Sequence, residues 1–396
     1  MHEDGADLGR RLRQIRHAKG KSLAVVADRA GISLSYLSRL ESGARALDRR
    51  SLIKALADAL EVAPTDITGA AVAPPGHVEE DRALAAVRLA LLAVSMGDPR
   101  GQVVPAEVLE VRVGRLMEAQ RRCRYTEVGA DLPGLIQDLH TTLNANREIE
   151  HVLRLLVLLQ IQGTQAWLTD IGASVDLAWQ AVTLGRQAAE RLDDPVFCAV
   201  SAFGSAHGLL AAGAFDMAGR QLVENVPGTA EPASLSVTGM LTLTSSLVAA
   251  ASGERSERAA ALDQAADLAA AVDGEDDPLW FGFNSANVAV WRMSVALEAG
   301  NHAEAARIAT TVNPAELPSP TRRAAYWREY GRALARLPRR HDDAVVMLRR
   351  AEQISPARIH RHPFMRSVLA ELLTKARRDA VGRELRGMAY RAGLPV

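Results

Sequence analysis

Residues 23–41, LAVVADRAGISLSYLSRLE, carry small, apolar and capping residues at the spacing of two short helices joined by a tight turn. Ala27 is small where the two helices would cross most closely, and Gly31 suits a turn that favours positive φ. The hydroxyls of Ser22 and Ser33 can cap the two helices. The apolar positions expected to share one core are Val26, Ala30, Ile32, Leu37 and Leu40. This pattern predicts a helix-turn-helix motif, with an ordinary helical hairpin as the alternative.

A first amphipathic helix is expected before this motif. Leu8, Leu12 and Ile15 recur at helical spacing, and Gly20 follows as a stop signal. Residues 8–56 hold twelve Lys and Arg against three acids, although the formal net charge of the whole chain is zero. A basic N-terminal domain on a neutral protein favours phosphate binding confined to that domain. Chance clustering on a solvated surface is the alternative.

The second helix of such a motif would read DNA from the major groove, through its N-terminal turn and the face one turn later. Arg39 is the best candidate for bidentate pairing with a guanine, and Leu34 could touch a thymine methyl. The predicted contact positions on this helix are Ser33, Leu34, Ser35, Ser38 and Arg39. Beyond it, Arg45, Arg49 and Arg50 suit phosphate or minor-groove contact, or form a solvated charge cluster.

The run GISLSYLSRLESGARALDRRSLIKALADALEVAPTDI resembles the lambda-repressor-like, Xre-type helix-turn-helix domains, as found in actinobacterial regulators. The resemblance covers residues 8–68 and implies a five-helix domain at residues 1–68. It also implies that Arg16, late in the first helix, pairs with Glu41 at the end of the recognition helix. The sequence departs from the family at Leu23, where a glutamine that contacts the DNA backbone is common, so we assign no contact to Leu23.

The composition beyond this domain favours helices throughout. Ala and Leu dominate the chain and aromatic residues make up only 4% of it, so we predict an all-α fold. Residues 69–79, GAAVAPPGHVE, concentrate Gly, Ala and Pro and predict a linker. Residues 80–396 should then form successive helices, with breaks at Gly97-Asp98-Pro99 and Asp193-Asp194-Pro195.

One segment of the body carries a repeat-like pattern. Small and large residues follow one another as Trp327, Tyr330, Gly331, Leu334, Ala344, Leu348, Ala351 and Pro356. This pattern resembles a tetratricopeptide repeat, and the whole layout resembles Xre-type regulators fused to such repeats, including the peptide-sensing Rgg and PlcR kind. The resemblance implies a superhelix with a concave groove, a homodimer formed through the repeats, and a small-molecule or peptide ligand in the groove.

Polar side chains on two expected helices are candidates for contact with such a ligand. Asn284, Asn287 and Trp291 share one helical face, where amides could bond a ligand and the indole could stack on it. Thr238 and Thr242 form a hydroxyl stripe on a preceding helix. The alternative for both sets is helix packing and capping.

Catalytic and metal-binding patterns are lacking in the sequence. No phosphate-binding loop, dinucleotide fingerprint, zinc-protease motif or nucleophile elbow occurs, so we expect neither an enzyme nor a cofactor. Cys123 and Cys198 imply no disulfide framework and no metal site. We interpret His360 and His362, with Arg361 between them, as a basic solvated turn. The N-terminus lacks a secretory pattern, so we expect the protein in the cytoplasm, with no membrane partner.

Two functions remain open at this point. The first is a ligand-responsive transcription factor that binds a double-stranded operator as a homodimer. The second is an adaptor whose repeats dock another protein while the N-terminal domain localises the assembly to DNA.

Overall fold

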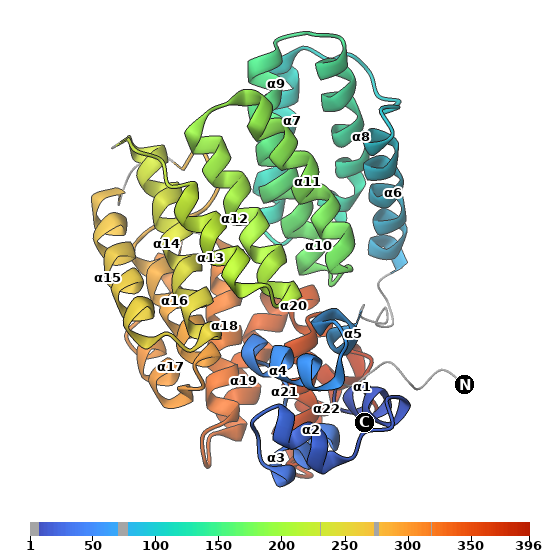
Figure 1. Cartoon of the computed structure of the whole chain (residues 1–396), viewed down its shortest axis with the longest axis vertical. Helices are drawn as coiled ribbons and strands as arrows, with labels where there is room; N and C mark the ends of the chain where they lie inside the picture. The colour runs from blue at the N-terminus through green and yellow to red at the C-terminus, as the bar shows by residue number, and fades with distance from the viewer. Residues whose placement is uncertain (1–7, 70–77, 230, 273–276, 318) are drawn as a thin grey trace.

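The computed structural model describes residues 8–69, 78–229, 231–272, 277–317 and 319–396. The chain is all-helical, as predicted, and no strand occurs within those ranges. Figure 1 shows the N-terminal helices, in blue, at one end of a larger helical array and beside helices from the C-terminal end of the chain.

The first five helices form a unit that we call the head: α1 (Leu8–Ala18), α2 (Leu23–Arg29), α3 (Leu34–Glu41), α4 (Arg50–Leu60) and α5 (Pro64–Thr68). Both capping predictions are confirmed, because Ser22 accepts a hydrogen bond from Val25 N and Ser33 accepts one from Tyr36 N. Gly31 has a φ of 65°, the left-handed conformation that the turn after α2 requires. Leu12, Val26, Leu37, Leu40 and Leu56 are buried in the core of the head.

Most of the predicted linker, residues 70–77, lies outside the described residues. The body begins with α6 at Val78, two residues before the predicted start at Glu80. Its first half comprises α6 (Val78–Ser95), α7 (Ala106–Arg121), α8 (Tyr125–Asn144), α9 (Ile149–Leu158), the π-helix η1 (Leu159–Gln165), α10 (Ala166–Asp170), α11 (Val175–Leu192), α12 (Pro195–Ala212) and α13 (Phe215–Glu224). The predicted breaks at residues 97–99 and 193–195 fall at helix ends.

The second half of the body continues the array. It comprises α14 (Pro232–Ser252), α15 (Arg255–Val272), α16 (Ser285–Glu298), α17 (His302–Ala309), the 3-10 helix η2 (Pro314–Glu316), α18 (Pro320–Ala335), α19 (His341–Ile354), α20 (Pro356–His360), α21 (Pro363–Leu373) and α22 (Ala380–Arg391). Helices α14 and α15, α16 and α17, and α18 and α19 pack as successive hairpins. We call α6 to α22 the helical repeats.

The hairpin of α18 and α19 shows why its sequence needs small residues. A Cβ atom on Gly331 would lie 2.6 Å from Leu348 Cδ2 and 3.3 Å from the carbonyl oxygen of Ala344. Ala344 and Leu348 are fully buried in the same cluster. The two helices can therefore approach this closely only because position 331 has no side chain.

The end of the array turns back onto its beginning. Arg358 Nη2 of α20 lies 2.9 Å from Asp170 Oδ2 of α10, and Arg358 Nε donates to the hydroxyl of Tyr125 at 3.2 Å. Our interpretation of residues 360–362 as a solvated turn is therefore wrong: His360 and Arg361 are both 4% exposed. Arg361 lies against α6, 3.0 Å from Asp81 Oδ1, so the turn is enclosed between two ends of the array.

Two helices, α12 and α14, are long and apolar enough to cross a membrane by length and composition. The buried share of their most apolar window is 44% for α12 and 78% for α14. The large buried share of α14 is that of an internal helix of the repeats.

Candidate DNA-binding surface

Helix α3 presents a polar, exposed face away from the core of the head. Leu37 and Leu40 anchor the helix in the core, while Ser35, Ser38 and Arg39 are exposed. Leu34 is 52% exposed although it is apolar. The Arg39 side chain forms no ion pair with any residue that the structure describes. The face that would enter a groove of DNA therefore carries one uncompensated cation and one exposed aliphatic side chain.

A buried ion pair fixes α3 against α1. Arg16 Nε lies 2.6 Å from Glu41 Oε1 and Arg16 Nη2 lies 2.8 Å from Glu41 Oε2, so the contact is bidentate. The hydrogen bond from Glu41 raises the pKa of the Arg16 guanidinium. Because both side chains are buried, this pair fixes the orientation of α3 relative to α1.

The segment between α3 and α4 packs against the helical repeats. Arg336, the C-cap of α18, places its Nη2 2.7 Å from Asp48 Oδ1, and Arg332 Nη2 of α18 donates to the carbonyl oxygen of Asp48 at 2.8 Å. Burial raises the pKa of the Asp48 carboxyl, but the charges of Arg336 and Arg332 outweigh burial and hold that pKa below its ordinary value. The head therefore contacts the repeats through a buried, ionised carboxylate.

Two buried glutamates of the repeats bond to backbone of the head. Glu298, at the end of α16, accepts a hydrogen bond from Ser51 N at 2.9 Å. This amide is one of the unpaired donors at the start of α4, and Arg49 at the N-cap supplies no side-chain cap. Glu371 of α21 accepts a hydrogen bond from Ala46 N at 2.8 Å. The repeats thus complete the hydrogen bonding of the head.

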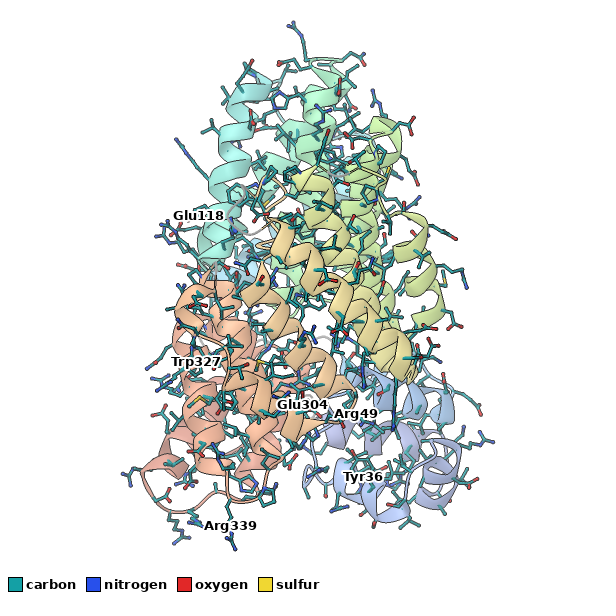
Figure 2. All side chains as sticks on the ribbon, turned by 90° about the vertical axis from the view of Figure 1, so that its left-hand side faces the viewer. Tyr36, Arg49, Glu118, Glu304, Trp327 and Arg339 are labelled. Atoms are coloured by element: carbon teal, nitrogen blue, oxygen red, sulfur yellow. The ribbon has the colours of Figure 1, made fainter. Side chains whose placement is uncertain are left out.

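The three arginines predicted to contact phosphate lie at this boundary. Arg45 Nη1 is 3.6 Å from Glu371 Oε1, and Arg50 Nη1 is 3.4 Å from Glu298 Oε2. Figure 2 shows Arg49 at the edge of the head, near the labelled Glu304 of α17. In this arrangement, which we call docked, Arg45 and Arg50 are paired with carboxylates of the same chain.

Sequence reasoning missed one residue of the head core. Phe364 of α21 is 7% exposed and belongs to the hydrophobic cluster of the head. The guanidinium carbons of Arg50 and Arg332 lie 5.6 and 5.7 Å from the centre of its ring. No local sequence signal marks Phe364 as part of the head core, because its partners in the head are about three hundred residues away in the chain.

Residues 7–68 match a family model described as a helix-turn-helix domain. The matched range covers the head and stops before α6. No curated protein and no solved structure matches the chain. The match and the exposed face of α3 together indicate a DNA-binding regulator.

The predicted ligand contacts lie in different surroundings. Asn284 caps α16 by accepting a hydrogen bond from Asn287 N, and the fully buried Asn287 donates from Nδ2 to the carbonyl oxygen of Gly282. Thr242 donates its hydroxyl hydrogen to the carbonyl oxygen of Thr238 within α14. Trp291, in contrast, lines a cavity between the head and the helical repeats. Among the described residues, no group of three or more His, Cys, Asp or Glu side chains is placed to hold a metal ion.

Proposed function

We propose that this chain is a sequence-specific transcriptional regulator with an Xre-type head, whose tetratricopeptide-like repeats form a homodimer and sense a small ligand or peptide. The observation that carries the proposal is the exposed face of α3, on a head that matches a helix-turn-helix family model. Arg39 would pair with a guanine and Leu34 would contact a thymine methyl.

The remaining serines of this face suit a supporting role. Ser35 and Ser38 are exposed beside Arg39, and a hydroxyl can donate to or accept from several base edges. Ser33 is occupied with Tyr36 N, so its hydroxyl would approach a phosphate rather than a base. Once the head is released from the repeats, Arg45, Arg49 and Arg50 would be free to contact phosphates.

The dimer is supported by an exposed apolar stripe on α6. Leu89 and Leu92 of α6 are 67% and 45% exposed and share one helical face. Met96, directly after the last residue of α6, is 84% exposed and continues this stripe, since its amide still bonds to the carbonyl oxygen of Leu92. An exposed apolar face of this kind favours association with a second copy of the chain. A dimer would present two heads to the two halves of a symmetric operator.

Selection of duplexes from a random pool by the full-length protein tests the proposal. We expect an enriched motif with two-fold symmetry, and loss of preference at one position of each half-site in Arg39→Ala. Arg88→Ala, which changes an exposed arginine of α6, should select the wild-type motif. Failure to enrich any motif would contradict the proposal and favour the adaptor function.

A further inference from the structure

A cavity of about 560 Å³ separates the head from the helical repeats. Its wall on the head side is formed by α4, α5 and Gly69, and the repeats supply the remainder from α7, η1, α10 to α12, α16, α18, α20 and α21. A volume of this size lies within the range of small-molecule sites. The cavity exists only where the two parts meet, so an occupant would contact both.

Aromatic rings form the apolar part of the wall. Phe203, His207 and Trp291 are in edge contact, with ring centres 4.6 Å apart for the first pair and 6.0 Å for the second. Trp280 also lines the cavity, and the Arg121 guanidinium lies 5.3 Å from its ring centre. Such a wall suits a flat apolar group.

The same wall contains more positive charge than its acids neutralise. Most of its arginines have carboxylate partners: Arg50 pairs with Glu298, Arg121 with Asp277, Arg358 with Asp170 and Arg361 with Asp81. Arg322 is the exception, because it forms no ion pair with a residue that the structure describes. Its Nη2 donates only to the carbonyl oxygen of Phe281, at 2.7 Å.

Arg322 remains charged in this setting. Burial lowers its pKa to about 10 and the neighbouring Arg358 acts in the same direction, while the charges of Asp277 and Asp170 oppose this shift. A pKa of about 10 leaves the guanidinium protonated at neutral pH. The other acids of the wall, Asp66 and Asp176, are exposed side chains. Arg322 is partly buried, and the nearby carboxylates of Asp277 and Asp170 are already paired with Arg121 and Arg358, so the cluster keeps a net positive charge that favours an anionic ligand.

We infer that the cavity binds a small organic anion with a planar apolar body, whose charged group pairs with Arg322 while its body lies among Trp280, Trp291 and Phe203. The inference deepens the ligand-sensing part of the proposed function and rests on it. A ligand that contacts both walls favours the docked arrangement, because that arrangement completes its site. Docking keeps Arg45 and Arg50 paired with Glu371 and Glu298, so the ligand lowers affinity for DNA.

A pair of fluorescent probes tests the charge recognition directly. Anilinonaphthalene sulfonate carries an anionic group on a flat apolar body, and phenylnaphthylamine has a similar body without charge. Arg322→Gln should weaken binding of the sulfonate by at least about tenfold and leave the neutral probe within about twofold. Arg323→Gln, which changes the neighbouring arginine outside the cavity wall, is the matched control.

The folding of each variant is checked by circular dichroism and thermal melting. If Arg322→Gln does not fold, Arg322→Lys keeps the charge and should retain sulfonate affinity within about fivefold, because the ammonium still pairs with an anion. Equal loss of both probes in Arg322→Gln would overturn the inference. So would equal affinity of the wild-type protein and a folded Arg322→Gln for the sulfonate.

Hydrogen exchange of residues 46–51 reports docking independently of DNA. The amides of Ala46, Leu47 and Ser51 donate to Glu371, Ser367 and Glu298, and these bonds exist only in the docked arrangement. Saturating sulfonate should slow exchange of these amides in the full-length protein and weaken binding to duplex DNA by about fivefold or more. Neither effect should occur in Arg322→Gln.

The two proposals fail in different ways. If the wild-type protein shows no sequence preference in the absence of the probe, the regulator function is contradicted. The hydrogen-exchange measurement would still test whether the cavity binds the anion and favours docking. Sequence-specific binding that stays unchanged in saturating sulfonate, with unchanged exchange, would contradict the ligand inference alone.

Discussion

Asp48 of the head and Arg336, the C-cap of α18, form a buried ion pair across 288 positions of the sequence, with Asp48 Oδ1 2.7 Å from Arg336 Nη2. Asp48 is 4% exposed. Separation of the head from the repeats would therefore break this ion pair and expose its carboxylate and guanidinium to water. The pair is one of the buried polar contacts that hold the head against the repeats.

We predict that Asp48→Asn loosens docking. The free energy of docking should fall by up to about 3 kcal/mol, because Arg336 and Arg332 lose a buried partner and keep only Glu371 and Glu329. Amides 46–51 should exchange faster, and affinity for duplex DNA should rise. Asp58→Asn is the control, since Asp58 pairs with Lys54 on the surface of α4. Unchanged exchange in Asp48→Asn would contradict the role of this pair.

Arg39 and Arg49 should differ in how they affect DNA binding. Arg39 projects from the recognition helix, so Arg39→Ala should relax specificity at one position and cost about 1–3 kcal/mol. Arg49 lies beyond that helix, so Arg49→Ala should weaken all sequences alike and reduce the salt dependence of binding. Titrations of specific and random duplexes at several salt concentrations measure both effects. Equal losses on both duplexes for both variants would refute the assignment.

The ion pair of Arg16 and Glu41 should be necessary for a stable head. Glu41→Ala leaves the Arg16 guanidinium buried without its carboxylate, so we expect a loss of about 3–5 kcal/mol in stability of the head. Glu61→Ala removes an acid that is 65% exposed and bound to Lys21 and Arg29, and should cost far less stability than Glu41→Ala, because water screens an exposed pair. Hydrogen exchange in the head under increasing urea measures both. Similar losses for the two variants would argue against this account.

Two partly buried histidines, His140 and His207, predict loss of stability in mild acid. Burial lowers the pKa of His140 from 6.5 to about 4 and that of His207 to about 3. Below pH 6.5 the unfolded chain binds protons at these rings and the folded chain does not, so the free energy of unfolding falls as the pH drops from about 6.5 to about 4. Each ring contributes up to about 1.4 kcal/mol per pH unit.

Urea unfolding at neutral and mildly acidic pH checks the effect of His140. His140→Gln should show a shallower fall of stability with pH than the wild-type protein. His151→Gln, which changes a more exposed histidine of α9, should follow the wild-type curve. A His140→Gln curve parallel to wild type would show that this ring is protonated in the folded state.

The stripe on α6 predicts how the dimer can be disrupted. Leu92→Glu places a charge among Leu89 and Met96, so it should convert the dimer to a monomer and weaken binding to a two-fold operator by about tenfold or more. Val223→Glu changes an exposed apolar residue of α13 and serves as control. Sedimentation equilibrium measures the mass of each variant. A wild-type protein that sediments as a monomer would contradict the proposed dimer.

Local sequence patterns determined the secondary structure of the head and the division of the body into helices. Helix caps at Ser22 and Ser33, and the turn at Gly31, depend on neighbours within a few residues of the chain. Their effects can therefore be predicted without knowledge of the tertiary fold. The same holds for the exposed face of α3, because its alternation with Leu37 and Leu40 follows the helical period.

Only the tertiary structure decided where the head lies and what it contacts. The sequence pattern predicts that Arg45 and Arg50 contact phosphate or form a solvated charge cluster, whereas in the fold they pair with Glu371 of α21 and Glu298 of α16. Asn287 shows the same limit, since its helical face predicts a ligand contact and its buried amide bonds to Gly282. Helical periodicity predicts which residues share a face of a helix. It does not predict what packs on that face, because the packing partners can be hundreds of residues away in the chain. The contacts of Asp48 and the cavity beside Arg322 are therefore properties of the folded chain.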